Sequence, residues 1–179
     1  MELVIYQSNY GHTKQYAEWI CQALSCPSHP LDQMAQADIE AVDTIIFGSS
    51  VIAGNYKGIN RFVEIIKEYP NKHFIFFGVS IANPDNEDSQ NYLEEALARG
   101  LDDSVRHQVK VFLFRGGMDY SKLNFLHKAM MWMMVRMLKK KEVKSEEDIA
   151  MIENYGKKVD YSNPIYIQPL VDYVINLRE

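Results

Sequence analysis

The chain has few cysteines, no long apolar run and no excess of positive charge, and each of these shortages excludes a class of protein. Its 179 residues include two cysteines, Cys21 and Cys26, whose spacing fits neither a CxxC redox motif nor half of a zinc site. No stretch reaches the ~18 uncharged apolar residues that a membrane-spanning helix requires. A net charge of −5 lacks the basic face typical of nucleic-acid-binding proteins, so no nucleic-acid partner is expected.

The remaining composition is that of an ordinary folded domain. With 47% hydrophobic and 24% charged residues, the chain fits a single domain over residues 1–179 that needs no disulfide or metal. Residues 1–6 lack both the positive segment and the long apolar segment of a secretory signal. We therefore expect a cytoplasmic protein.

Short apolar runs alternate with helical patterns along the sequence. This alternation predicts an α/β fold, a doubly wound five-stranded parallel sheet in the order 2-1-3-4-5 with helices on both faces. Ligands of such sheets bind outside the carboxyl ends of the strands, where the strand order reverses. The expected strands are 3–6, His29–Met34 as a weaker edge strand, 44–48, 74–79 and 109–114. The expected helices include 16–24, 59–66, 92–101 and 170–177, where apolar residues recur three and four apart.

The loop after the first strand, Gln7–Thr13, has the features of a phosphate site. Gly11 lets backbone approach a ligand closely, and the N–H groups at the start of the next helix attract an anion. Ser8 and Thr13 add hydroxyl groups, although Thr13 is also typical of a helix cap. The loop has neither the GxxxxGK[ST] nor the GxGxxG pattern, which argues against nucleotide hydrolysis and weakens a dinucleotide interpretation.

The loops after the third and fourth strands complete the predicted binding edge. Residues 48–58 combine apolar side chains, glycines and small hydroxyls, which suits a flat aromatic ligand, although Tyr56 packing onto the next helix is the ordinary alternative. Residues 80–86 contain an Asn83-Pro84 turn signal. His12 is either a solvated residue at a helix start or a ligand contact. The loops show no acid, base or nucleophile with an evident partner, so any chemistry must come from a cofactor.

These loops give the chain its resemblance to the FMN-binding flavodoxin-fold family. Residues 8–13 resemble that family's phosphate loop, [ST]-x-x-G-x-T, and the similarity extends to the flavodoxin-domain group that includes bacterial menaquinone-dependent protoporphyrinogen oxidases. The resemblance is specific for fold and for FMN rather than for one enzymatic activity. It also covers residues 48–62, residues 114–120, the methionine-rich segment after Tyr120 and a C-terminal helix from about Ile165.

The resemblance implies a flavodoxin-like FMN site without a metal. The ribityl phosphate of FMN would lie against Ser8, Asn9, Tyr10, Gly11, His12 and Thr13. One side of the isoalloxazine ring would be bordered by Ser50, Val51, Ile52, Ala53, Gly54, Asn55 and Tyr56. The other side would be bordered by Ser80, Ile81, Ala82 and Asn83.

The segment 123–144 is both apolar and basic. Residues 123–138 contain five of the nine methionines, and residues 136–144 carry five bases and one acid. In one interpretation this helix packs on the sheet, and its bases lie favourably at its C-terminal end. In the other, it presents a surface to a membrane, a quinone or a second copy of the chain.

Together these features predict an FMN-dependent oxidoreductase that passes electrons from a small-molecule substrate to a quinone or a similar acceptor. Protoporphyrinogen oxidation is the most specific activity that the resemblance implies. The alternatives are a one-electron carrier flavodoxin that docks on redox proteins, and a flavin-free scaffold. Carriers tend to be strongly acidic, which a net charge of −5 with a basic segment does not match well. Homodimer formation and peripheral membrane contact through residues 123–144 stay open.

Overall fold

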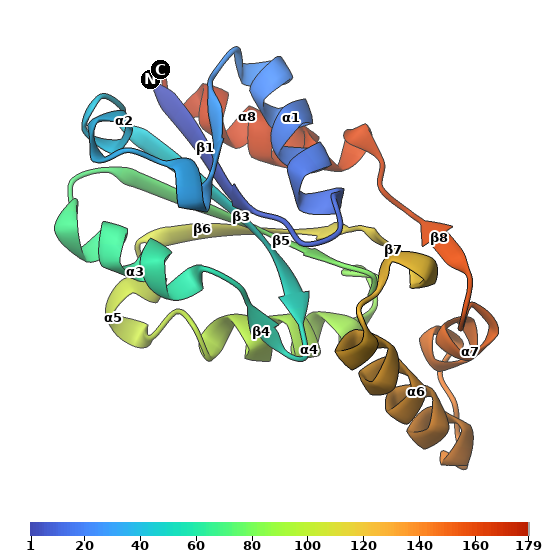
Figure 1. Cartoon of the computed structure of the whole chain (residues 1–179). Helices are drawn as coiled ribbons and strands as arrows, with labels where there is room; N and C mark the ends of the chain where they lie inside the picture. The colour runs from blue at the N-terminus through green and yellow to red at the C-terminus, as the bar shows by residue number, and fades with distance from the viewer. Residues whose placement is uncertain (179) are drawn as a thin grey trace.

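Near-continuous apolar runs form the centre of a parallel sheet in the computed structural model, which describes residues 1–178 (Figure 1). The strand order β2-β1-β3-β5-β6 confirms the predicted order 2-1-3-4-5, and all four of these pairings are parallel. The strands are β1 (Glu2–Gln7), β2 (Ser28–Pro30), β3 (Thr44–Ile52), β5 (His73–Ser80) and β6 (Val109–Arg115).

The edge strand is shorter than the sequence pattern predicts. The expected strand His29–Met34 is wrong beyond Pro30, where the chain turns into a 3-10 helix, η1 (Leu31–Gln33). Proline has no N–H to continue a ladder, so the strand ends there. A short helix, α2 (Gln36–Glu40), then leads into β3, and the sequence analysis did not predict it.

Helices cover both faces of the sheet, as predicted. Alternate residues of the central strands point to opposite faces, so Val4 and Ile46 enter one core cluster while Ile5 and Ile45 enter the other. The first cluster is closed by α1 (His12–Leu24) and α8 (Gln168–Asn176). The second is closed by α3 (Ile59–Glu68), α4 (Glu87–Ala98) and the one-turn helix α5 (Asp103–Arg106).

The third strand continues into a hairpin where the sequence analysis expected a loop. β3 runs on to Ile52 and returns as β4 (Asn55–Tyr56), antiparallel to it. Ala53 and Gly54 join the two with φ values of 51° and 73°. Two successive positive φ angles match the twist of a tight hairpin. The strand does not end at Gly48, because residues 49 and 50 still pair with β5 and residues 51 and 52 pair with β4.

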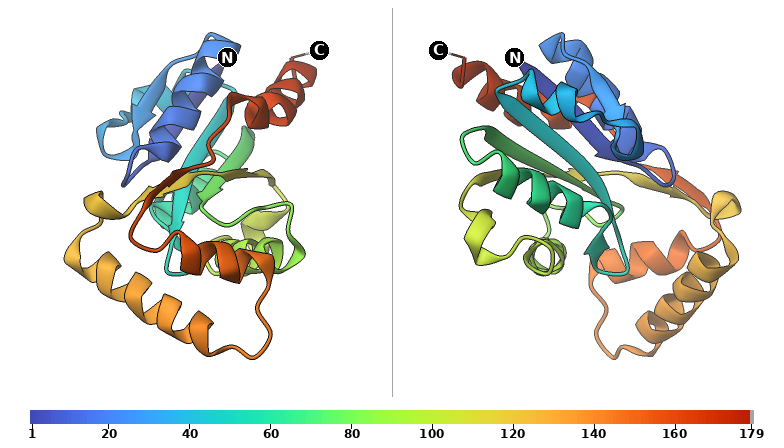
Figure 2. Two further views of the ribbon diagram at one scale, coloured as in Figure 1. Left: turned by 90° about the vertical axis from the view of Figure 1, so that its right-hand side faces the viewer. Right: turned by 60° about the vertical axis from the view of Figure 1, so that its left-hand side comes forward.

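Residues 117–160 form an excursion that leaves the sheet after β6 and returns before α8. It contains β7 (Gly117–Asp119), η2 (Tyr120–Lys122), α6 (Phe125–Lys140), α7 (Glu146–Glu153) and β8 (Lys158–Asp160). β7 and β8 pair antiparallel at its base, and η3 (Pro164–Ile167) connects it to α8. Figure 2 shows α6 and α7 side by side, outside the layers that cover the sheet. α8, and not the methionine-rich α6, therefore takes the place of the last helix on the sheet.

Candidate functional site

The three predicted loops leave the sheet at one edge. In the strand register, Gln7 lies opposite Ser49, and Ser80 lies opposite Arg115. The carboxyl ends of β1, β3, β5 and β6 are thus aligned, with the reversal of strand order between β1 and β3. This is the edge at which doubly wound sheets bind their ligands.

The first loop presents the start of α1 without a side-chain cap. Gly11 is the residue before the helix, with a φ of 100°, and no side chain bonds to the N–H groups of the first turn. A side chain built on Gly11 would meet nothing within 4 Å, so the space beside its backbone is open. Gly11 N–H itself donates to Ser8 Oγ at 3.2 Å, which holds the loop in this shape. Free N–H groups and the positive end of the helix dipole make this turn a place for an anion.

The excursion holds two side chains of the first loop. The Tyr10 hydroxyl is hydrogen-bonded to Nδ1 of His127 on α6. His12 Nδ1 lies 3.0 Å from Ser162 Oγ and 3.6 Å from Asp160 Oδ1. Burial lowers the pKa of His12, and the negative charge of Asp160 partly opposes this. The rings of Tyr10 and His12 are therefore directed to the excursion, while the backbone at Gly11 stays open.

The other residues of the first loop differ in exposure. Thr13 is buried, and Asn9 is half-buried. Thr13 therefore lies inside the fold at the start of α1, and Asn9 remains accessible at the loop surface.

The β3–β4 hairpin places the second predicted group of residues. Its tip is tied to the residue that follows α4, since Arg99 donates to the carbonyl of Gly54 at 3.1 Å. Tyr56 is 3% exposed and packs edge-on against Phe76, with ring centroids 5.0 Å apart. Burial raises the pKa of Tyr56. The ring of Tyr56 therefore belongs to the core below the hairpin.

Two buried hydroxyls at this edge have no partner among residues 1–178. They are Ser50 Oγ, two residues before the end of β3, and the hydroxyl of Tyr56. Val51 and Ile52 are half-buried beside Ser50, and Asn55 turns back to bond the carbonyl of Ala53 at 3.0 Å. Ser50 therefore retains an unused hydrogen-bonding group at the carboxyl end of a central strand.

The third loop is organised by its own hydrogen bonds. Ser80 is buried, and its Oγ accepts from Ala82 N at 3.0 Å while its carbonyl accepts from Gly116 N at 2.6 Å. Asn83 Oδ1 accepts from Asp85 N at 3.2 Å. Ile81, Ala82 and Asn83 are half-buried at the site edge. The loop is thus preshaped, and β6 lies beside it.

Arg115, at the end of β6, is a site-edge residue that the sequence analysis missed. Its guanidinium lies 4.0 Å from the ring centroid of Tyr161 and pairs with Glu147 at 3.5 Å. Its Nε also lies 3.5 Å from the carbonyl of Ile81 in the third loop. The rule that selects residues just after each strand would have found Arg115. His127, Asp160 and Ser162 carried no such signal, because the excursion has no strand in the main sheet.

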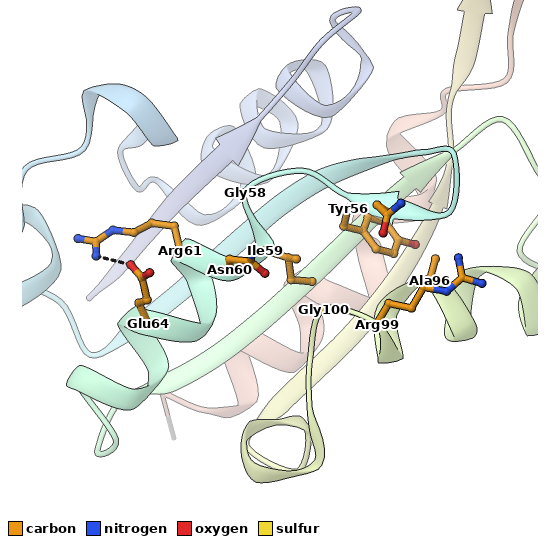
Figure 3. Close-up of a pocket in the computed structure, with 10 residues that line it drawn as sticks. Tyr56, Gly58, Ile59, Asn60, Arg61, Glu64, Ala96, Arg99 and Gly100 are labelled. Carbon is orange, nitrogen blue, oxygen red and sulfur yellow. Dashed lines mark hydrogen bonds and ion pairs between the residues drawn. The ribbon is translucent and has the colours of Figure 1, made fainter. Parts of the chain in front are cut away.

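A hollow of about 610 Å³ lies on the outer side of the hairpin, between α3 and α4 (Figure 3). Of the predicted site residues, Asn55 and Tyr56 line it, together with Arg61, Glu64 and Arg99. Arg61 is paired with Glu64 at 2.8 Å. None of the lining residues described comes from the first or third loop, so the hollow is separate from the edge where those loops meet.

The chain is similar to one protein family and to several solved structures. Residues 3–145 match the family described as "Flavodoxin domain". The solved flavodoxin, WrbA-like protein from Agrobacterium tumefaciens is 20% identical, with 87% of this chain and 91% of that chain covered and a TM-score of 0.43. The Trp repressor binding protein from Bacillus subtilis is 16% identical, with coverage of 65% and 85% and a TM-score of 0.46. No curated protein matches the sequence. Because the family match spans most of the sequence, from the first strand to the end of the basic segment, this chain belongs to the flavodoxin domain family.

Proposed function

We propose that this chain binds FMN and acts as an oxidoreductase. The observation that carries the proposal is the uncapped first turn of α1, which begins at Gly11 beside open space. A phosphate there would accept hydrogen bonds from backbone N–H groups and lie at the positive end of the helix dipole. No lysine or arginine is needed, since backbone amides and the hydroxyl of Ser8 supply the donors.

The other two loops suit a flat ring at the same edge. The hairpin offers the half-buried Val51 and Ile52, and the third loop offers Ile81 and Ala82. Ser50 Oγ has no protein partner, so it is free to bond a polar atom of the ligand. These residues would border the ring, exclude water from it and orient it. The flavin itself would supply the electron-transfer chemistry.

We infer that the reaction is a two-electron transfer from a small-molecule substrate to a quinone or a similar acceptor. Support comes from the resemblance to the protoporphyrinogen oxidase group, which makes protoporphyrinogen the first substrate to assay. The charge distribution points the same way, because α6 carries four bases and no acid while strongly acidic surfaces are typical of carriers.

The decisive experiment is an FMN titration of the purified protein, followed by stepwise anaerobic reduction in the absorption spectrometer. We expect saturable flavin binding and loss of the oxidised bands without a stable one-electron-reduced spectrum. Oxidation of protoporphyrinogen with a menaquinone analogue would then be measured. A strongly stabilised one-electron-reduced spectrum would instead favour the carrier, and absence of FMN binding would leave a flavin-free scaffold.

A further inference from the structure

The exposed apolar side chains of this protein are concentrated on the excursion. Of the 12 large hydrophobic residues that are exposed among residues 1–178, seven lie between Phe125 and Ile149. Within α6, Val135 alone is buried. The exposed apolar side chains of α6 are Phe125 at 89%, Leu126 at 64%, Trp132 at 53%, Met133 at 56% and Met137 at 64%.

These five side chains share one face of the helix. At 3.6 residues per turn, they fall within an arc of about 140° around the helix axis. Three exposed bases, Arg136, Lys139 and Lys140, lie on the same side near its C-terminal end. The guanidinium of Arg136 lies 5.3 Å from the ring of Trp132. We name this surface of apolar and basic side chains the α6 face.

Among residues 1–178, no ion pair involves the three bases of the α6 face, Arg136, Lys139 and Lys140. The sequence from Phe125 to Lys140 contains no Asp or Glu. Of the acids on neighbouring α7, Asp148 is paired with Lys141 at 2.8 Å and Glu147 with Arg115 at 3.5 Å. The face therefore combines large apolar side chains with bases that form no ion pair among residues 1–178.

We propose that the α6 face docks on an anionic membrane surface. An interfacial helix lies in the plane of the membrane, with aromatic and aliphatic side chains in the acyl boundary and bases at the headgroup phosphates. α6 is about 24 Å long at 1.5 Å per residue, and among residues 1–178 no helix is long and apolar enough to cross a membrane. The proposal goes beyond FMN binding, because lipid contact requires no flavin.

The charge distribution favours a membrane over a second copy of the chain. A symmetric dimer through the α6 face would bring Arg136, Lys139 and Lys140 of two copies near one another. Like charges without counter-ions in an interface are repulsive. Phosphates of an anionic lipid surface instead supply the missing negative charge.

The α6 face is connected to the proposed flavin site. His127, near the start of α6, bonds Tyr10 of the first loop, and Ser162, after β8, bonds His12. A protein docked through α6 would thus hold its first loop close to the membrane surface. A lipid-dissolved electron acceptor would then need to travel only a short distance.

The test is co-sedimentation of the full chain with vesicles of phosphatidylcholine, with or without phosphatidylglycerol. We expect binding to the vesicles that contain phosphatidylglycerol and weak binding to the others. Trp132→Glu with Met133→Glu should weaken binding roughly tenfold, because it introduces charge into the apolar part of the face. Lys139→Gln with Lys140→Gln should weaken it by roughly thirtyfold, since each base near an anionic surface contributes roughly a fivefold gain in binding.

Matched controls separate the α6 face from general surface effects. Ile165→Glu changes a side chain on η3 that is 64% exposed, and Lys67→Gln with Lys110→Gln removes two charges elsewhere. Both controls should bind like the wild type. In a Trp19→Phe background, a blue shift of Trp132 emission on adding anionic vesicles would report insertion of the face.

Three results would overturn the proposal. The first is that the wild type does not bind anionic vesicles. The second is that the α6 variants and the controls lose equal amounts of vesicle binding. The third is that the lipid-free protein forms a dimer, which the Trp132 and Met133 changes dissociate. Light scattering of lipid-free protein detects that dimer. FMN titration of the same samples distinguishes failure of docking from failure of the flavin site, because the α6 variants leave the first loop unchanged.

Discussion

The Nδ1 atom of His12 lies 3.0 Å from the hydroxyl oxygen of Ser162, a residue 150 positions further along the chain. Together with the bond between Tyr10 and His127 on α6, this contact ties the first loop to the excursion and to the segment that follows it. The loop that we propose for phosphate binding is therefore shaped partly by residues outside the sheet. Its stability and its ligand affinity should respond to changes in the excursion.

Gly11 and Gly156 provide a matched pair for the phosphate site. Both have positive φ angles, 100° and 82°, and open space where a side chain would begin. Gly11→Ala and Gly156→Ala should each destabilise the fold by about 1 kcal/mol through backbone strain. Gly11→Ala alone should weaken FMN binding, by roughly tenfold or about 1.4 kcal/mol, because its methyl group occupies the approach to the phosphate. Flavin titration and urea unfolding of both variants check this. Equal FMN affinities of the two variants would show that the phosphate does not bind at Gly11.

The lowered pKa of His12 predicts a pH dependence of stability. Its ordinary value is 6.5, and burial lowers it in the fold. At pH values between the lowered pKa and 6.5, the unfolded chain binds more protons at His12 than the folded chain does. The free energy of unfolding therefore falls as the pH drops below 6.5 towards the lowered pKa. In urea unfolding from pH 8 downwards, His12→Asn should lose less stability over this window than the wild type. Asp160→Asn should lose more stability, since it removes the negative charge that partly opposes the lowering of the His12 pKa. Parallel curves of stability against pH for all three proteins would show that His12 does not cause this pH dependence.

The ion pair between Glu2 and Arg178 joins the two ends of the described chain. Two hydrogen bonds of 2.8 Å connect the guanidinium to the carboxylate, and the Glu2 side chain is 7% exposed. Arg178→Ala should destabilise the fold by about 2 kcal/mol, because it leaves a buried carboxylate unpaired. Arg61→Ala breaks an exposed pair with Glu64 and should cost about 0.5 kcal/mol or less. Urea unfolding of the two variants at neutral pH provides the comparison.

The same ion pair predicts acid sensitivity. Hydrogen bonding to Arg178 lowers the pKa of Glu2 from 4.5, so the stabilisation is present above pH 4.5 and is lost as the pH falls through the lowered pKa. The difference in stability between wild type and Arg178→Ala should therefore shrink in acid. A difference that stays constant down to low pH would show that the contact stabilises through packing alone.

Two buried tyrosines should respond to loss of their hydroxyls in opposite ways. The Tyr56 hydroxyl has no partner, so Tyr56→Phe should stabilise the flavin-free protein by about 1 kcal/mol. The Tyr16 hydroxyl donates to the carbonyl of Arg115 at 2.6 Å and accepts from Asn163 N at 3.3 Å. Tyr16→Phe should therefore destabilise by about 1–2 kcal/mol. Thermal or urea unfolding distinguishes the two, and destabilisation by both changes would show that Tyr56 has a bonding partner in solution.

Local patterns predicted the sheet well but missed the β3–β4 hairpin and the position of Arg115. The apolar runs identified the four long strands, and the crossover rule arranged them correctly, since both depend on periodicity and handedness. Tyr56 was expected beside a ring or on the next helix, but the positive φ angles at Ala53 and Gly54 fold the chain back and bury it against Phe76. Arg115 was overlooked as a site residue although it is the last residue of β6, at the same edge of the sheet as the predicted loops.

The sequence by itself determined the strand order, the sheet edge where the loops meet and the glycine that opens the first loop. These features follow from the alternation of strands and helices along the chain, which already implies which strands lie next to one another. Only the tertiary structure decided that α6 leaves the sheet, that α8 replaces it and that the excursion returns to Tyr10 and His12. An apolar helix has the same periodicity whether it is buried or exposed, so its neighbours depend on the path of the chain between residues 117 and 160.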